Sequence, residues 1–525
     1  MQSITPEQLA QNDGKEGRPS WIQIGHEVFN MTSFQDFHPG GKSALQKAAG
    51  KDATQAFNLF HGAQVMPKYH AKFKVGEIAS AKDELELLVE KRDFARGMLL
   101  DTELAFGDQI PYGDPAFYQR QAAHSPYYRE THLKFRREVR EFVDREIIAT
   151  MHEWKNDNAP PMDLVGKLGQ RGYLACMAGG TPFPHDHVDP GTPCPQDFDF
   201  FHIQILLDEI ARCGDSSVLS ALTNGPSIAV CALLKFGSQE LKQSGVIREV
   251  LMGRKMIALA VTEPVGGSDV AALACELNVD TMTVTGNKKF ITNGMYADYL
   301  TLLAKEKQTG KMTMVLVDCQ SAEGYKAIKC KVRGSELSGT ALLDFCNTKV
   351  AHIVGERGQG FKMQMAAFNF ERWYVSVCAV RLARNLLEES IKYCLKRHTF
   401  GKALHEHQAI RMRIAEMIRD IESVQAWIDA ITFQMNSLDI TRAAVVLGDV
   451  VASAKVQVSL VYERCARHCT HIFGGNSLQM DSAGGRVESS LIQMKGYLIP
   501  AGAADILDDF TVRTVFRLAP NIAKL

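Results

Sequence analysis

The stretch Val261-Thr262-Glu263-Pro264-Val265-Gly266-Gly267-Ser268-Asp269 is followed, about twenty residues later, by Gly286-Asn287-Lys288-Lys289-Phe290-Ile291-Thr292-Asn293-Gly294. The glycines allow backbone N–H groups to approach a ligand closely, and the hydroxyl side chains can form hydrogen bonds with it. Either stretch alone is compatible with a plain β-turn-β segment, because a glycine-rich turn is a weak signal. The two in this order and at this spacing are a stronger signal, which indicates a ligand site.

The hydrophobic periodicity changes on both sides of these stretches. From about residue 125 to 255 apolar residues recur at helical spacing, as between Phe135 and Val143. From about 256 to 350 the period is two, as in the β-branched run from Met312 to Val317. Beyond about residue 358 the pattern is helical again, in long segments. The sequence therefore predicts helices, then a β middle, then helices.

Two further islands lie in the C-terminal part: Arg397-His398-Thr399-Phe400-Gly401-Lys402 with His407-Gln408, and Ile472-Phe473-Gly474-Gly475. Together the four islands resemble the acyl-CoA dehydrogenase family over roughly residues 120–520. The resemblance implies FAD bound between a central β domain and a C-terminal four-helix bundle, with the Arg and the Gln reaching the FAD of a neighbouring subunit. The residues that it places at the cofactor are Val261, Thr262, Gly267, Ser268, Phe290, Ile291, Thr292, Arg397, Phe400, Gln408, Gly474 and Gly475. His471 and Asn476-Ser477 depart from the family pattern, so we expect altered cofactor contacts at the last island.

The catalytic base is where the chain departs most from this family. Desaturation of a thioester needs a carboxylate to remove the α-proton, and many members carry it in a late Tyr-Glu-Gly-Thr segment. That segment falls here on Pro500-Ala501-Gly502-Ala503, where no side chain can accept a proton. Isovaleryl and long-chain members place the base earlier, in a Glu-Arg pair that matches Glu371-Arg372, 29 residues before Phe400.

We therefore predict Glu371 as the base. An apolar acyl slot would raise the pKa of Glu371 toward the working range of a base. The alternative is that Glu371 forms an ion pair with a Lys or Arg of a neighbouring helix, as most helical glutamates do.

A second motif lies near the N-terminus, where His38-Pro39-Gly40-Gly41 is followed by His61 twenty-three residues after His38. Two neutral imidazoles on opposing short helices can hold a haem iron from both faces, and an iron with both axial positions filled transfers electrons. The flanking run Trp21-Ile22-Gln23-Ile24 alternates like a strand. Roughly residues 3–78 resemble the cytochrome b5 family, which implies haem b with His38 and His61 as ligands. The alternative is a turn with an incidental histidine.

The domain organisation follows from both resemblances. We predict a multidomain α+β protein: a small α+β cytochrome b5-like domain, then an acyl-CoA dehydrogenase fold with an N-terminal α bundle, a middle β-barrel and a C-terminal four-helix bundle. The predicted boundaries are 1–80 for the haem-binding domain, 81–119 for a linker, and 120–257, 258–357 and 358–525 for the three remaining domains.

Composition restricts the partners and the compartment. Lys+Arg is 59 against Asp+Glu 60, so no excess charge favours nucleic acid. We see no run of about 18–20 apolar residues and expect no membrane span. Twelve cysteines without a CxxC pair indicate a reducing compartment, and the terminal Ala523-Lys524-Leu525 is close to a peroxisomal signal, so we expect a peroxisomal or otherwise cytoplasmic protein. The resemblance implies a homodimer or homotetramer.

The predicted function is FAD-dependent α,β-desaturation of an acyl-CoA, as in fatty acid β-oxidation, with a fused haem b module as an electron outlet. The haem domain would take the place of the soluble electron-transfer flavoprotein that serves ordinary family members. One alternative is an oxidase of the same fold that acts on an acyl-CoA or a nitroalkane and reduces oxygen. Another is a non-catalytic haem electron-transfer protein with a degenerate flavin fold. The acyl chain, its carrier and the natural electron acceptor stay open.

Overall fold

The computed structural model describes residues 2–61, 65–78, 110–115, 125–157, 159–438, 440–480 and 482–522. It divides into two compact units. The first comprises Met1–His124, Leu386–Glu416 and Arg467–Glu488, and the second comprises Ser125–Asn385, Met417–Ala466 and Ser489–Leu525. Most of the predicted linker 81–119 and the terminal tripeptide 523–525 lie outside the described residues.

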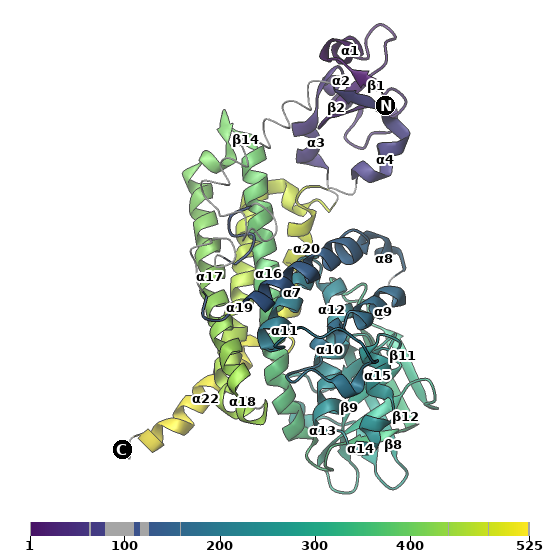
Figure 1. Cartoon of the computed structure of the whole chain (residues 1–525), viewed down its shortest axis with the longest axis vertical. Coiled ribbons are helices and arrows are strands. Elements are labelled where there is room, and N and C mark those ends of the chain that lie inside the picture. The colour runs from purple at the N-terminus through teal and green to yellow at the C-terminus, as the bar shows by residue number, and fades with distance from the viewer. Residues whose placement is uncertain are drawn as a thin grey trace. The chain divides into compact units, whose positions relative to one another are not determined.

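The N-terminal residues up to 78 fold around a five-stranded sheet with the strand order β1-β5-β3-β2-β4 (Figure 1). The strands are β1 (Gln2–Ile4), β2 (Trp21–Ile24), β3 (Glu27–Asn30), β4 (Lys51–Asp52) and β5 (Lys74–Ile78). The helices are α1 (Pro6–Gln11), η1 (Gln35–Phe37), α2 (Lys42–Ala48), α3 (Thr54–Phe60) and α4 (Val65–Phe73). Thr5 caps α1 and Pro6 occupies its first turn, which is why the helix begins there. Ile22, Phe29, Leu45 and Phe73 are buried in one apolar cluster of this domain.

Helices make up the first part of the second unit. They are α7 (Glu130–Phe142), η3 (Val143–Ile148), α8 (Met151–Asp157), α9 (Met162–Gln170), α10 (Tyr173–Cys176), η4 (His185–His187), α11 (Phe200–Ala211), α12 (Ser216–Asn224), η5 (Gly225–Val230), α13 (Cys231–Phe236), α14 (Gln239–Gln243) and α15 (Val246–Leu251). Every residue of α11 is buried, so this helix forms the centre of the group.

One helical stretch of the described residues, Ser216–Phe236, is long and apolar enough to cross a membrane. Within the fold, 78% of its most apolar window is buried, so a core position explains its composition as well as a span does. The expected absence of a membrane span stays a prediction.

The middle of the second unit is a mostly antiparallel sheet with the strand order β11-β12-β8-β7-β9-β10-β13, to which β6 adds by pairing with β9. The strands are β6 (Ile257–Ala260), β7 (Glu276–Asn278), β8 (Thr283–Ile291), β9 (Tyr299–Glu306), β10 (Met312–Asp318), β11 (Tyr325–Lys329), β12 (Ala341–Lys349) and β13 (His352–Val354). Leu300, Leu302, Val315 and Phe345 are buried in its core, which agrees with the period-two pattern of the sequence.

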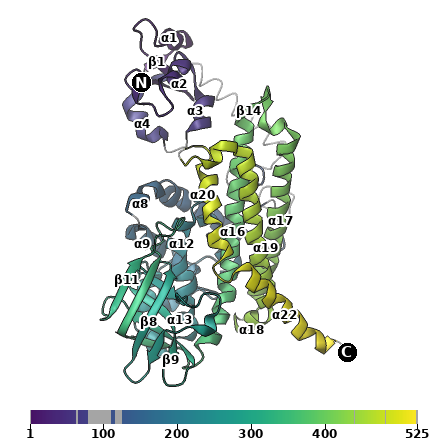
Figure 2. The same cartoon turned by 180° about the vertical axis from the view of Figure 1, so that it is seen from behind.

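Long helices form the C-terminal part, and α16, α17 and α19 run side by side (Figure 2). The elements are α16 (Gly360–Lys396), β14 (His398–Thr399), β15 (Lys402–Ala403), η7 (Leu404–Glu406), α17 (Gln408–Ser437), α18 (Ile440–Val446), α19 (Gly448–Phe473), η8 (Gly474–Leu478), α20 (Gly485–Gln493), α21 (Lys495–Leu498) and α22 (Ala504–Ile522). α16 begins close to the sheet, and glycine is required at residue 360 because a Cβ there would lie 2.8 Å from the Leu303 side chain and 2.9 Å from the carbonyl oxygen of Met312. The predicted order of helices, β middle and helices is confirmed.

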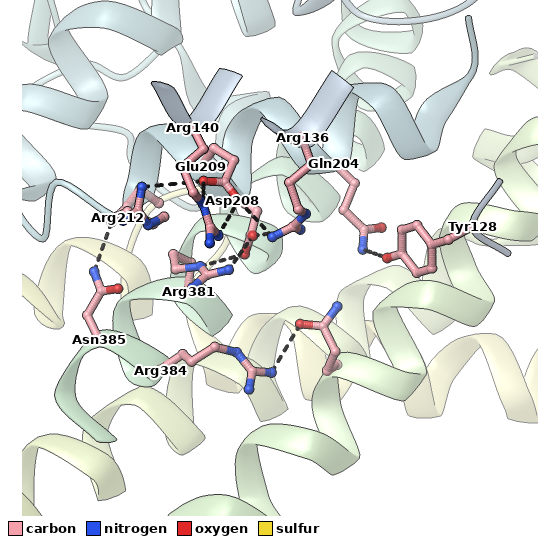
Figure 3. A network of polar contacts seen from close by, with 12 residues as sticks. Tyr128, Arg136, Arg140, Gln204, Asp208, Glu209, Arg212, Arg381, Arg384 and Asn385 are labelled. Atoms are coloured by element: carbon pink, nitrogen blue, oxygen red, sulfur yellow. Dashed lines mark hydrogen bonds and ion pairs between the residues drawn. The ribbon is translucent and has the colours of Figure 1, made fainter. Parts of the chain in front are cut away.

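A buried network of charges joins α7, α11 and α16 within the second unit (Figure 3). Arg136 donates to Glu209 at 2.7 Å and to Asp208 at 2.9 Å, and Arg140 donates to Glu209 at 2.8 Å. The guanidinium of Arg381 on α16 binds both oxygens of Asp208. These contacts tie the N-terminal helices to the helix that carries Glu371.

Candidate functional site

The two predicted haem ligands face one another in the N-terminal domain. The ring centroids of His38 and His61 lie 5.8 Å apart with 44° between the ring planes. Each histidine lies at the end of a short helix: His38 follows η1 and His61 follows α3, each as the C-terminal cap. Bonds between a metal and an imidazole nitrogen are about 2 Å long, so this separation suits one ion between the rings.

Both rings contact a backbone carbonyl oxygen through the same nitrogen, Nδ1. Nδ1 of His61 lies 3.1 Å from the carbonyl oxygen of Phe57, and Nδ1 of His38 lies 3.4 Å from that of Gly41. An imidazole that donates from Nδ1 to a carbonyl presents the lone pair of Nε2 to a metal. Gly40 is needed here, because a Cβ at residue 40 would lie 2.8 Å from the His38 ring.

Aromatic side chains surround the histidine pair. Phe57 stacks on His61 with 4.5 Å between the ring centroids, and Phe34 and His38 meet edge to face with 6.0 Å between theirs. Phe37 and Phe60 are 77% and 53% exposed. Exposed apolar rings beside two metal-competent imidazoles fit a planar apolar macrocycle, so the residues present fit haem.

The loop after β6 carries the first predicted flavin contacts. Its start is joined to β8, because the backbone N–H of Lys289 donates to the Thr262 carbonyl at 2.8 Å and Nζ of Lys288 donates to the Val261 carbonyl at 3.0 Å. Gly267 and Ser268 are exposed further along this loop. A Cβ at Gly267 would meet no atom within 4 Å, so the backbone there is open to a ligand.

The end of β8 carries the second group of predicted contacts. Phe290 has a left-handed backbone with φ 60° and a side chain that is 56% exposed, while Ile291 is buried and Thr292 half-buried. A left-handed bulky residue is strained and is usually retained for function. Because Lys289 is bonded to Thr262, the structure brings Phe290 and Thr292 close to the loop after β6. An exposed ring beside open backbone fits a flat ring such as that of FAD.

The remaining predicted flavin contacts lie in the first unit. Phe400 is 97% exposed with φ 52° in the turn between β14 and β15, and Gln408 is exposed at the start of α17. The guanidinium of Arg397 forms no hydrogen bond or ion pair among the described residues. Gly474 and Gly475 are exposed, and their neighbour Phe473 stacks on Tyr393 at 4.2 Å, four residues before Arg397. This unit therefore offers an unpaired cation and open glycine backbone, which suit phosphate oxygens.

Glu371 lies on α16 in the second unit and is half-buried. Its carboxylate has no hydrogen bond or ion pair among the described residues, so the alternative of an ion pair with a neighbouring helix does not hold there. Loss of solvent around the carboxylate raises the pKa of Glu371 to about 7, although the charges of Arg372 and Lys455 lower it. An unpaired carboxylate with a pKa near neutrality is suited to accept a proton.

The loop between α21 and α22, which holds Ala501, contacts the residue that follows Glu371. Nε of Arg372, next to Glu371 in sequence, donates to the carbonyl oxygen of Ala501 at 3.1 Å. Nζ of Lys455 on α19 donates to the carbonyl oxygens of Leu498 at 3.0 Å and Gly502 at 2.8 Å. Lys455 was missed by sequence reasoning. Its mark in the sequence is that it is the single charged residue in the stretch from Val450 to Val458.

Comparison with known protein families gives four matches along the chain. The family described as "Cytochrome b5-like Heme/Steroid binding domain" matches residues 5–79. The N-terminal, middle and C-terminal domains described for acyl-CoA dehydrogenase match residues 129–248, 258–344 and 358–516.

Relatives match most of the chain. The acyl-CoA dehydrogenase AFT10-1 of Alternaria alternata is 31% identical over 417 residues, which are 78% of this chain and 96% of that protein. The acyl-CoA dehydrogenase apdG of Emericella nidulans is 29% identical over 426 residues, with the same coverage. Among solved structures, a putative acyl-CoA dehydrogenase of Mycobacterium smegmatis has a TM-score of 0.67 and 28% identity, covering 74% of this chain and 99% of that one.

Proposed function

Because the chain belongs to the acyl-CoA dehydrogenase family of FAD-dependent oxidoreductases acting on CH–CH bonds, with a cytochrome b5-like domain at its N-terminus, we propose that it desaturates an acyl-CoA and delivers the electrons to its own haem b. The observation that carries this proposal is the carboxylate of Glu371, which has no ion-pair partner among the described residues, on a chain with alanine at residue 501. A carboxylate without an ion-pair partner there supports the assignment of Glu371 as the base.

Glu371 removes the proton in the proposed reaction. The Cα–H bond of the thioester breaks, its proton goes to the Glu371 carboxylate, and the electron pair forms the Cα–Cβ double bond as hydride leaves Cβ. FAD, when bound, supplies the hydride acceptor. Near neutral pH a substantial fraction of Glu371 is ionised, because its pKa lies at about 7.

Two groups of predicted residues would contact FAD, one in the middle β domain and one in the first unit. Phe290 and Thr292 would contact the flavin ring, and the open backbone at Gly267 would admit the cofactor. Arg397 and Gln408, whose side chains point to no partner among the described residues, would serve the FAD of a neighbouring subunit. Because these two residues would contact the FAD of another subunit, the proposal includes a homo-oligomer.

Electron exit would use the N-terminal domain. His38 and His61 would hold haem b by their Nε2 atoms, and haem b supplies one-electron transfer. The exposed rings of Phe37 and Phe60 would cover its edges.

The test of the proposal is rapid mixing of the purified protein with a panel of acyl-CoA thioesters without oxygen. We expect the flavin absorbance to bleach and the haem Soret band to shift to its reduced position within one turnover. A Soret band that stays oxidised while the flavin is fully bleached would exclude the electron delivery. In air, hydrogen peroxide in equal amount to product would identify an oxidase instead.

We expect His61→Ala to abolish haem binding, because the apolar site would keep only one ligand. The absence of the Soret band in the purified variant, with flavin content unchanged, checks this. His70→Ala is the matched control, since His70 lies in the same domain but its Nε2 bonds to Glu27 at 2.8 Å. A variant at residue 61 with full haem content would contradict the ligand assignment.

A further inference from the structure

The end of α21 and the loop that joins it to α22 are held by side chains that bind their carbonyl oxygens. Arg372 binds the carbonyl of Ala501, and Lys455 binds those of Leu498 and Gly502. Ser459, one turn after Lys455 on α19, donates to the carbonyl of Tyr497 at 2.9 Å. Ala501 has a left-handed backbone with φ 57°. The loop therefore keeps a defined and strained shape although it carries no carboxylate.

Lys455 is a buried cation without a carboxylate partner. Its side chain is 1% exposed, and no ion pair links it to an acidic residue in the described part of the chain. It nevertheless lies within electrostatic range of Glu371. A buried ammonium without a counter-ion is costly, so its presence calls for an explanation.

We propose that Lys455 is a positioning residue of the reaction: its ammonium fixes the loop through Leu498 and Gly502, and it keeps a positive charge near Glu371 without pairing with it. This inference rests on the proposed function, because it takes Glu371 as the base. In a contact ion pair the ammonium would bind the Glu371 carboxylate at the oxygens that must accept the substrate proton. The two carbonyl bonds keep the ammonium from that contact.

The electrostatic consequence follows from the groups that face Glu371. Arg372 from α16 and Lys455 from α19 both favour the ionised carboxylate and oppose the effect of burial on its pKa. Burial also lowers the pKa of Lys455 to about 8, so the ammonium is largely charged at neutral pH. Removal of the Lys455 charge therefore raises the pKa of Glu371 further and reduces the ionised fraction of the base at pH 7.

The titration of Glu371 can be measured without turnover. A carboxyl whose pKa is raised in the folded protein destabilises it increasingly as the pH rises from its unfolded value toward its folded value. We therefore compare the melting temperatures of the flavoprotein and its Glu371→Gln variant from pH 5 to 9. The melting temperature of the Glu371→Gln variant should exceed that of the wild type by an amount that grows with pH and levels off near pH 7. In a Lys455→Met background this difference should level off at least half a pH unit higher.

Two further variants separate charge from loop shape. Lys455→Gln keeps a donor but removes the charge, and we expect it to shift the titration as Lys455→Met does. Ser459→Ala removes a bond to the end of α21, just before the loop, without a change in charge, and we expect titration at the wild-type pH. Unchanged titration in both Lys455 variants, or an equal shift in Ser459→Ala, would overturn the inference.

Turnover is a separate readout. The acid limb of the rate of flavin reduction should move to higher pH in the Lys455 variants, in parallel with the titration. If no acyl-CoA reduces the flavin of the wild-type protein, the proposed function fails, whereas the titration still decides the charge effect of Lys455 on Glu371.

Discussion

Glu371→Gln is expected to slow the reduction of the flavin by acyl-CoA by about 10²–10⁴-fold, the usual contribution of a positioned general base. The amide has the size of the carboxylate but cannot take the α-proton. No other carboxylate replaces it in the late loop, because residue 501 is alanine. The measurement is the single-turnover rate of flavin bleaching in stopped flow.

Glu389→Gln is the matched control for this variant. It makes the same change on the same helix, at a half-buried residue whose carboxylate pairs with Arg486 at 3.0 Å. We expect its rate of flavin reduction to stay within about twofold of wild type, in line with the small worth of a half-exposed ion pair. Equal rates in Glu371→Gln and wild type would show that the base lies elsewhere.

The pH dependence of the same rate has a predicted sign. Only the ionised carboxylate accepts a proton, and the pKa of Glu371 lies at about 7. The rate should therefore rise as the pH increases through about 7 and should fall about tenfold for each unit below it. An unperturbed glutamate would give this rise near its ordinary pKa of about 4.3 instead.

Local signals explain what the sequence could predict. Glycine-rich islands, the change of period and the spacing from Glu371 to Phe400 are all readable along the chain, and the predicted domain order matches the structure. The partners of buried charges are not local. Lys455 bonds to carbonyls more than forty residues away, and backbone oxygens leave no mark in a sequence.

The buried network shows the same limit. Asp208 and Glu209 interrupt the apolar run of α11, so burial of charge there could be suspected from the sequence. The third partner, Arg381, lies 173 residues from Asp208 and becomes evident only in the folded chain. Neither the resemblance nor the periodicity indicated that this contact joins α11 to the helix of Glu371.

Asp208→Asn is expected to destabilise the folded second unit by about 3–5 kcal/mol, the cost of breaking a buried ion pair by removing one partner. The side chain keeps its shape, so packing is preserved. However, Arg381 loses the carboxylate whose two oxygens its guanidinium binds, and Arg136 loses its ion pair with Asp208. The measurement is the midpoint of thermal and urea unfolding of the flavoprotein.

Asp420→Asn is the matched control, because it breaks an ion pair of similar length in the same unit. Asp420 accepts from Arg464 at 2.8 Å, but the side chains are 25% and 40% exposed, so water replaces the lost charge. We expect a cost below about 1 kcal/mol. Equal melting temperatures for the two variants would mean that water reaches Asp208 as easily as Asp420, which contradicts the burial of Arg136 and Arg381 at 2% and 1% exposure. A large difference would instead show that the network fixes α16, and with it Glu371, against the N-terminal helices.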